Sequence, residues 1–210
     1  MAAALWRRRG SLALLLAAGV AALSALRPPA PRATLAVGTP LGRLAVLDGD
    51  TLRLPDGRRV RLPAVDTPEL GRPCAAQARD LTAARLAAAA DVRLAPADPP
   101  HDHYGRLLAD VLLDGFSLQE ALLSAGLATV YDSESPRLLA LQAQAVGARR
   151  GMHARLDRAH GPFLVTAHRF HRPGCPWVRG EGAAADLCPD AATALAAGRS
   201  PCRTCLAWPP

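Results

Sequence analysis

The chain has 210 residues, enough for one sizeable hydrophobic core and a small additional unit. All 25 basic residues are arginine, and with 18 acidic residues they give a formal net charge of +7. Residues 1–33 contain five arginines and no acidic residue, whereas residues 34–160 contain 15 of each sign. Net charge therefore does not mark the body of the chain as a nucleic-acid-binding surface, and such a function has to rest on local sites.

The first 33 residues have the layout of an export signal. Three arginines at residues 7–9 are followed by an apolar run over residues 11–26 and a proline-rich stretch over residues 27–33. The apolar run is shorter than the roughly 20 residues that span a bilayer as a helix. The pattern predicts an exported, extracytoplasmic protein, either secreted or anchored to the membrane by this segment. A buried N-terminal helix of a cytosolic protein is the alternative.

Residues 34–158 alternate between strand and helix patterns. The expected strands cover residues 35–37, 42–47, 51–54, 58–65, 91–97, 106–113 and 129–131. The expected helices cover residues 73–90, 117–124 and 135–148, and a polar loop is expected at residues 98–105. Ser117, followed three residues later by Glu120, forms a capping box. The order predicts a mainly β domain with helices (α+β), a five-stranded OB-type barrel with about three helices.

Acidic residues near two of the expected turns can bind a hard cation. Asp50 and Asp66 offer carboxylates and Thr67 a carbonyl, the oxygen ligands that such a cation prefers. Glu69 can then orient or deprotonate a water molecule. Taken separately, the run at residues 48–51 is typical of a hairpin turn, and the run that starts at Asp66 is typical of a helix start.

Two arginines can hold a phosphate next to these carboxylates. Arg106 follows Tyr104 at the entrance of an expected strand, and Arg61 precedes Asp66 by five residues. In a regular strand an odd separation puts two side chains on opposite faces. Arg61 and Asp66 therefore converge only if the strand bends, and Pro63 is the expected place. Together, the carboxylates and the guanidinium groups are suited to cutting a phosphodiester bond.

Four segments carry a resemblance to a known family: DGDT at 48–51, RLPAVDTPE at 61–69, DHYGRLLADVLLDG at 102–115 and LQEALLSAGLATV at 118–130. Over residues 34–158 the chain resembles the thermonuclease (staphylococcal-nuclease-like) family. The resemblance implies a calcium-dependent OB-barrel endonuclease that cuts DNA and RNA with low sequence specificity and leaves 3′-phosphate ends. The alternatives are an OB-type module that binds single strands without cutting and a DNA-damage recognition protein driven by the C-terminal segment.

The same resemblance implies a role for individual residues. The implied calcium ligands are Asp50, Asp66 and Thr67, the implied catalytic residues are Arg61, Glu69 and Arg106, and the implied substrate-binding residues are His103 and Tyr104. His103 replaces the basic residue that the family has before its Tyr-Gly-Arg run, and the aromatic residues after the last short strand are missing. These departures bear on affinity and base preference rather than on the chemistry. A monomer is expected.

Residues 162–208 are predicted to form a small C-terminal domain held together by a metal ion. His171, Cys175, Cys202 and Cys205 have the spacing of four tetrahedral zinc ligands. The segment resembles the metal-binding module of Ada-type DNA-repair proteins, in which the first of four cysteines accepts a methyl group. Because His171 stands at that first position, a structural zinc site without methyl transfer is expected. Disulfides that involve these cysteines or Cys188 are the alternative in an oxidising compartment.

Overall fold

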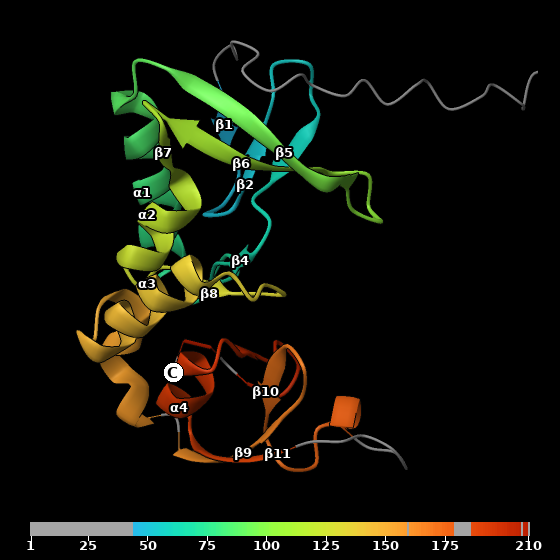
Figure 1. Ribbon diagram of the computed structural model, residues 1–210, viewed down its shortest axis with the longest axis vertical. Coiled ribbons are helices and arrows are strands. Elements are labelled where there is room, and N and C mark those ends of the chain that lie inside the picture. The colour runs from blue at the N-terminus through green and yellow to red at the C-terminus, as the bar shows by residue number, and fades with distance from the viewer. Residues whose placement is uncertain (1–43, 159, 179–185, 207, 210) are drawn as a thin grey trace, which may run out of the picture. The chain divides into compact units, whose positions relative to one another are not determined.

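A computed structural model describes residues 44–158, 160–178, 186–206 and 208–209 (Figure 1). The expected leader at residues 1–33 and the expected strand at residues 35–37 lie outside these described residues. Within the described ranges, no helix has both the length and the apolar character needed to cross a membrane. The chain from Leu35 to Pro210 forms one compact unit, so that contacts between its early and late segments belong to a single body.

Six strands from the part of the chain before residue 118 form one sheet in the order β1-β2-β3-β6-β5, and β7 also pairs with β6. Their bounds are β1 (Ala45–Val46), β2 (Thr51–Arg53), β3 (Arg59–Arg61), β5 (Val92–His101), β6 (Leu107–Leu113) and β7 (Phe116–Ser117). β3 pairs with β6 in parallel, and the other pairs are antiparallel. β4 (Val65–Asp66) and β8 (Thr129–Val130) form a separate two-stranded sheet. The expected mixed α+β fold of the OB type is confirmed, although the described strands do not pair into a closed barrel.

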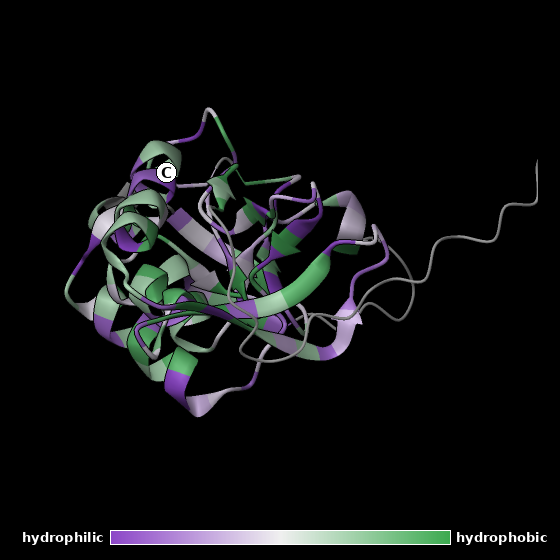
Figure 2. Ribbon diagram, turned by 90° about the horizontal axis from the view of Figure 1, so that it is seen from above, coloured by the Kyte–Doolittle hydropathy of each residue, from purple (hydrophilic) through white to green (hydrophobic). Residues whose placement is uncertain are grey.

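Strand β6 shows why this sheet forms a core. Its residues are alternately buried and half-buried, the pattern of a strand with one face against other elements. Helix α2 (Leu118–Ser124) packs against this strand, and α1 (Ala75–Ala88) and α3 (Pro136–Gly147) pack against α2. The fully buried leucines of this core are Leu52, Leu62, Leu118, Leu122 and Leu123. Hydrophobic segments accordingly appear on both the helices and the strands in Figure 2.

Two of the three helices begin at the residues that the sequence predicts. The Ser117 hydroxyl accepts a hydrogen bond from the backbone N–H of Glu120 at 3.3 Å, and Ser135 caps α3 in the same way through Leu138. Helix α1 begins at Ala75, two residues after the expected start, because Cys74 adopts a left-handed backbone conformation with φ of 64°. A helix cannot continue backwards through a residue in that conformation.

The structure corrects two expected elements. The strand expected over residues 58–65 is divided into β3 and β4 by a turn at Pro63 and Ala64, where φ of Ala64 is 62°. The polar loop expected at residues 98–105 is strand as far as His101, which pairs with Leu107. Pro99 and Pro100 fit into this extension because β5 is the last strand of the sheet, where missing N–H donors are tolerated.

The C-terminal segment has a four-stranded sheet in the order β11-β9-β10-β12. Its elements are the 3-10 helices η2 (Gly151–Arg158) and η3 (Pro176–Val178), the strands β9 (His160–Val165), β10 (Arg169–His171), β11 (Asp186–Asp190) and β12 (Ser200–Pro201), and α4 (Ala191–Ala196). The ring of Phe170 makes edge contacts with Phe163 and Trp208, at centroid distances of 5.2 and 5.7 Å. These aromatic residues give the segment a hydrophobic cluster of its own.

A buried glutamine joins this segment to the helices and strands that precede it. Gln142 of α3 accepts a hydrogen bond of 2.6 Å from the N–H of Val130 in β8 and donates one to the carbonyl of Leu195 in α4. Its side chain is fully buried. Because unpaired amide groups are costly in the interior, both partners are needed, and the pairing fixes α4 against α3.

Candidate active site

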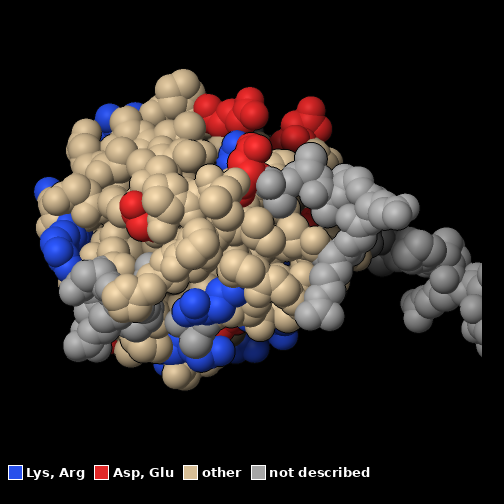
Figure 3. Space-filling view, turned by 90° about the horizontal axis from the view of Figure 1, so that it is seen from below, with Lys and Arg blue, Asp and Glu red and all other residues tan. Residues whose placement is uncertain are grey.

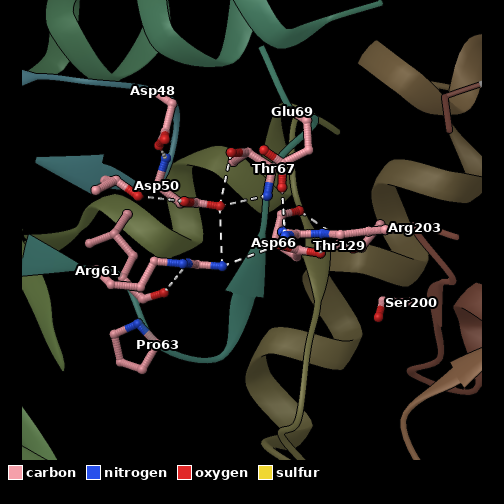
Figure 4. A network of polar contacts seen from close by, with 12 residues as sticks. Asp48, Asp50, Arg61, Pro63, Asp66, Thr67, Glu69, Thr129, Ser200 and Arg203 are labelled. Carbon is pink, nitrogen blue, oxygen red and sulfur yellow. Dashed lines mark hydrogen bonds and ion pairs between the residues drawn. The ribbon is translucent and has the colours of Figure 1, made fainter. Parts of the chain in front are cut away.

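The turn between β1 and β2 fixes the first carboxylate of the site. The hydroxyl of Thr51 donates to Oδ1 of Asp50 at 3.1 Å, and the N–H and hydroxyl of Thr67 both donate to Oδ2, at 2.8 and 2.9 Å (Figure 4). The carboxylate of Asp50 is therefore held in one orientation, and the residue is only 5% exposed. Asp48 lies beside it and accepts the backbone N–H of Asp50 at 3.1 Å.

Arg61 and Asp66 lie on the same side of the site. The NH2 atom of Arg61 is 3.2 Å from Oδ1 of Asp66 and 3.3 Å from Oδ2 of Asp50, so one guanidinium group bridges two carboxylates. The turn at Pro63 and Ala64 reverses the chain between them and makes this possible. Two contacts hold the turn: the side chain of Gln119 donates to the carbonyl of Pro63, and the N–H of Tyr131 donates to that of Ala64 at 2.9 Å.

The carboxylates are crowded and poorly solvated. Burial raises the pKa of Asp66, and the charge of Asp50 raises it further, against the opposing charges of Arg203 and Arg61. Burial and the charge of Asp50 also raise the pKa of Asp48. A hard cation with oxygen ligands would relieve this repulsion and lower both pKa values. The donor set therefore fits a divalent cation such as calcium, with Thr67 buried next to Asp50.

Arg106 lines the same cleft and is held by a carboxylate of its own. Its Nε atom donates to Oδ2 of Asp102 at 2.6 Å, and its backbone N–H donates to Oδ1 at 2.9 Å. Burial tends to raise the pKa of Asp102, but these bonds and the N–H of Tyr104 bring it below its usual value. The guanidinium carbon of Arg106 lies 5.5 Å from the centre of the Tyr104 ring, which in turn contacts His103.

These residues line one open cleft of about 620 Å³. It brings together every residue that the sequence assigned to calcium, catalysis or substrate: Asp50, Arg61, Asp66, Thr67, Glu69, His103, Tyr104 and Arg106. Asp66 is buried, whereas Glu69 and Tyr104 are exposed at the rim. The cleft can therefore expose a phosphate to carboxylates and guanidinium groups at the same time.

Arg203 also lines the cleft, although no sequence pattern indicated it. Its Nε atom donates to Oδ2 of Asp66 at 3.3 Å, its NH2 atom contacts Oδ1, and its NH1 atom is 2.5 Å from Oε1 of Glu69. Arg203 lies 137 residues after Asp66, between Cys202 and Cys205. Nothing in the local sequence pairs it with an acidic residue of the cleft.

The four residues predicted as zinc ligands also meet. The ligand atoms of His171, Cys175, Cys202 and Cys205 all lie within 4.8 Å of one another. The sulfur atoms of Cys175 and Cys202 are 4.0 Å apart, about twice the length of a disulfide bond. Cys188, the remaining cysteine of the C-terminal segment, instead donates to the carbonyl of Asp190 at 3.3 Å. The cluster can hold a metal ion.

His171 carries the clearest mark of a ligand in this cluster. Its Nδ1 atom is buried and has no hydrogen-bond partner among the described residues, while its Nε2 atom is 3.4 Å from the hydroxyl of Thr166. Burial, together with the charge of Arg169, lowers the pKa of the imidazole and keeps it neutral. A neutral imidazole with one nitrogen free and the other held by a neighbour is the usual state of a metal ligand.

One stretch of the chain that carries part of this cleft has a nuclease-like fold. Residues 59–155 match the family model of staphylococcal nuclease homologues, a little under half of the chain. The matched part has the OB-type fold and contains Arg61, Asp66, Glu69 and Arg106, whereas Asp50 precedes it. The C-terminal segment lies beyond the match, and its resemblance to the Ada-type module stays an expectation. A search among curated proteins found no match.

Proposed function

We propose that the chain is a calcium-dependent phosphodiesterase that cuts DNA, RNA or both within the strand, with low sequence specificity, and leaves 3′-phosphate ends. The observation that carries this proposal is the position of Arg61, whose NH2 atom lies within 3.3 Å of both Asp50 and Asp66. It supports a joint site for a cation and a phosphate, in a part of the chain that has a nuclease-like fold.

The charge of the cleft supports a cation requirement. Among the described residues that line it, seven are acidic and four are arginine. A polyanionic substrate would be repelled by this excess of negative charge. The face shown in Figure 3 likewise has arginines and acidic residues in separate small groups. Binding of a nucleic acid therefore depends on local neutralisation by a divalent ion.

Calcium would be held by the carboxylates of Asp50 and Asp66 and the carbonyl of Thr67. When bound, it supplies positive charge that polarises the phosphate and lowers the pKa of a nearby water molecule. Glu69 accepts the proton of the attacking water. Arg61 and Arg106 donate to the phosphate oxygens as negative charge builds up. Asp102 orients Arg106 for this task, since it binds both the side chain and the N–H of that residue.

The substrate side of the cleft supports low sequence specificity. Tyr104, with 75% of its surface exposed, offers a ring on which a base or sugar can stack, and His103 lies against it. Base stacking tolerates any sequence, and arginine contacts to phosphate carry no sequence information. Breaking the bond to the 5′ oxygen leaves the phosphate on the 3′ end, and Arg106 can stabilise the departing oxygen.

For the C-terminal cluster we propose a structural zinc ion held by His171, Cys175, Cys202 and Cys205. Three sulfur ligands and one nitrogen ligand suit zinc better than calcium. The N–H of Arg172 lies 3.2 Å from the sulfur of Cys205, a contact that would stabilise a thiolate ligand. With four protein ligands the site is closed, which is typical of a structural role.

We also propose that the chain is exported and then secreted or tethered through its N-terminal segment. The support is the sequence of residues 7–33, where arginines precede an apolar run and a proline-rich stretch. Expression of the full chain with a C-terminal epitope, followed by cell fractionation and N-terminal sequencing, tests this. Recovery of the intact chain in the cytoplasm would contradict it.

The test of the nuclease is a supercoiled-plasmid nicking assay with calcium or with chelator. Cutting is expected only with calcium, and Glu69→Gln and Arg61→Ala should reduce the rate by about 100-fold or more. The matched controls are Glu134→Gln and Arg58→Ala. Glu134 is exposed, and Arg58 is paired with Asp56 outside the cleft. If both site variants cut at the wild-type rate, the proposed nuclease activity is rejected. If the wild-type chain binds nucleic acid without cutting it, the OB-type binding module is favoured.

The product ends give a second test. Fragments with 3′-phosphate ends are not extended by a DNA polymerase until a phosphatase has removed the phosphate, and their 5′ hydroxyl groups accept phosphate from a kinase at once. The opposite pattern would show that the other phosphodiester bond is broken. Parallel digests of DNA and RNA of the same sequence would show which substrate is preferred.

A further inference from the structure

The guanidinium group of Arg203 lies where a cation would be expected in the candidate active site. It contacts both carboxylate oxygens of Asp66 and one oxygen of Glu69. Figure 4 shows it reaching these two side chains from the side opposite Arg61. A positively charged residue of the C-terminal segment therefore contacts two of the carboxylates of the site.

This contact and a calcium ion compete for the same atoms. Asp66 is almost fully buried, and its two oxygens already have Arg203 and Arg61 as partners. A hard cation needs direct contact with carboxylate oxygen, and close approach to a guanidinium group would bring two positive charges together. Burial tends to lower the pKa of Arg203, but the charges of Asp66, Glu69 and Asp50 raise it above its usual value, so the group stays charged.

We propose that Arg203 is an internal counter-cation of the active site, which calcium has to displace from Asp66 and Glu69 before the site can act. The inference rests on the proposed function, since it assumes that these carboxylates receive calcium. It assigns the C-terminal segment a role at the cleft: it sets the calcium concentration at which the nuclease becomes active.

The position of Arg203 in the chain couples it to the proposed zinc site. Its neighbours Cys202 and Cys205 are two of the four clustered ligands. The backbone here is also tied down, because the N–H of Cys202 donates to the carbonyl of Phe170 at 3.0 Å. A metal ion that binds both cysteines holds Arg203 at the cleft. By linkage, the two metal sites then oppose one another, and zinc weakens the binding of calcium.

The test is isothermal titration of calcium into the full chain at constant ionic strength, in the zinc-loaded state. Arg203→Gln should bind calcium about tenfold more tightly than the wild type, a gain of roughly 1.4 kcal/mol, because the competing charge is gone. Arg137→Gln is the matched control. Arg137 is also an exposed arginine in an ion pair, but its partner is Glu120 at 2.7 Å, on the helical side of the molecule. Its removal should leave calcium affinity unchanged.

A second arm tests the coupling. Cys205→Ser, checked for folding by circular dichroism, should lose zinc and shift calcium affinity towards that of Arg203→Gln. When Cys205→Ser is combined with Arg203→Gln, it should not change calcium affinity any further. Calcium affinity that is insensitive to loss of zinc in the Arg203-containing chain would overturn the coupling.

Failure of the inference and failure of the proposed function give different results. Equal or weaker calcium binding by Arg203→Gln, together with loss of binding in Asp66→Asn, would reject the counter-cation and keep the calcium site. Binding that survives in Asp66→Asn, or no binding in any variant at millimolar calcium, would reject the calcium site itself and the inference with it.

Discussion

The hydroxyl of Thr82 in helix α1 donates a hydrogen bond of 2.8 Å to the carbonyl of Gly49, in the turn that carries Asp48 and Asp50. The helix therefore supports the acidic turn directly. Gly49 is close enough to its surroundings that an added Cβ would lie 2.7 Å from Ala78 and 2.9 Å from Thr67. There is thus no space for a larger side chain at Gly49, where the acidic turn meets helix α1 and the segment that contains Thr67.

Gly49→Ala should accordingly damage the site. We expect the turn to move away from Thr67, with loss of calcium-dependent cutting and of about 1–3 kcal/mol of folding stability. Plasmid nicking and urea unfolding measure the two effects. Gly147→Ala is the control, because a Cβ at Gly147 has nothing within 4 Å. Wild-type activity in Gly49→Ala would show that the turn does not position the catalytic carboxylates.

Gln142→Leu should loosen the connection between the nuclease-like part and the C-terminal segment. The leucine has a similar volume but leaves the N–H of Val130 and the carbonyl of Leu195 without their partner. Buried groups left unpaired cost about 1–3 kcal/mol each. Urea unfolding should show a lower midpoint, whereas Gln144→Leu, at an exposed position of the same helix, should change it little. Equal urea midpoints for Gln142→Leu and the wild type would show that the hydrogen bonds of Gln142 do not stabilise the protein.

His153 should make the protein less stable in mild acid. Burial lowers the pKa of this imidazole to about 4, well under its ordinary value of 6.5, and within the described part of the chain neither ring nitrogen has a hydrogen-bond partner. Between these two pH values the unfolded chain binds a proton that the folded chain does not, so stability falls as the pH falls from 6.5 towards 4. The effect is on the order of 3 kcal/mol when complete.

The measurement is the free energy of unfolding of the wild type and of His153→Leu as a function of pH. The difference between the two should change by that amount across the window and stay constant above it. His160→Leu, at an exposed position, is the control. A constant difference from pH 4 to 7 would mean that His153 takes up its proton over the same pH range in the folded and the unfolded chain.

Metal analysis should find one zinc ion per chain in protein purified under reducing conditions. Cys202→Ser should lose it, because one of four ligands is removed. Cys188→Ala is the matched control, since this buried cysteine of the same segment is not part of the cluster. Cobalt substitution adds a spectroscopic readout of thiolate ligands. A chain without metal but with two fewer titratable thiols would establish the disulfide alternative.

Much of the fold could be predicted from local sequence. Ser117 and Ser135 initiate helices through short-range hydrogen bonds, and the alternation in residues 107–113 places one face of β6 in the core. The carboxylates were also found from sequence, because hard-cation chemistry restricts the residue types. These features depend on neighbours in the chain, which a sequence displays directly.

The remaining features depend on contacts between distant residues. A bend between Arg61 and Asp66 was expected at Pro63, but not the contact that holds it, which comes from Gln119, 56 residues later. The ion pair of Arg203 spans 137 residues, and its acidic partner is identifiable only once the C-terminal segment has folded against the cleft. Strand β5 continues beyond its expected end at residue 97 for a related reason, since Pro99 and Pro100 are compatible with a strand only at the end of a sheet.

The prolines of β5 also have a consequence for solubility. An outermost strand normally offers a row of unpaired N–H groups to which another chain can add, the first step of many aggregates. Pro96, Pro99 and Pro100 have no N–H to offer, and Asp98 adds a charge that resists stacking. The chain is thereby protected from edge-to-edge pairing with another copy along β5.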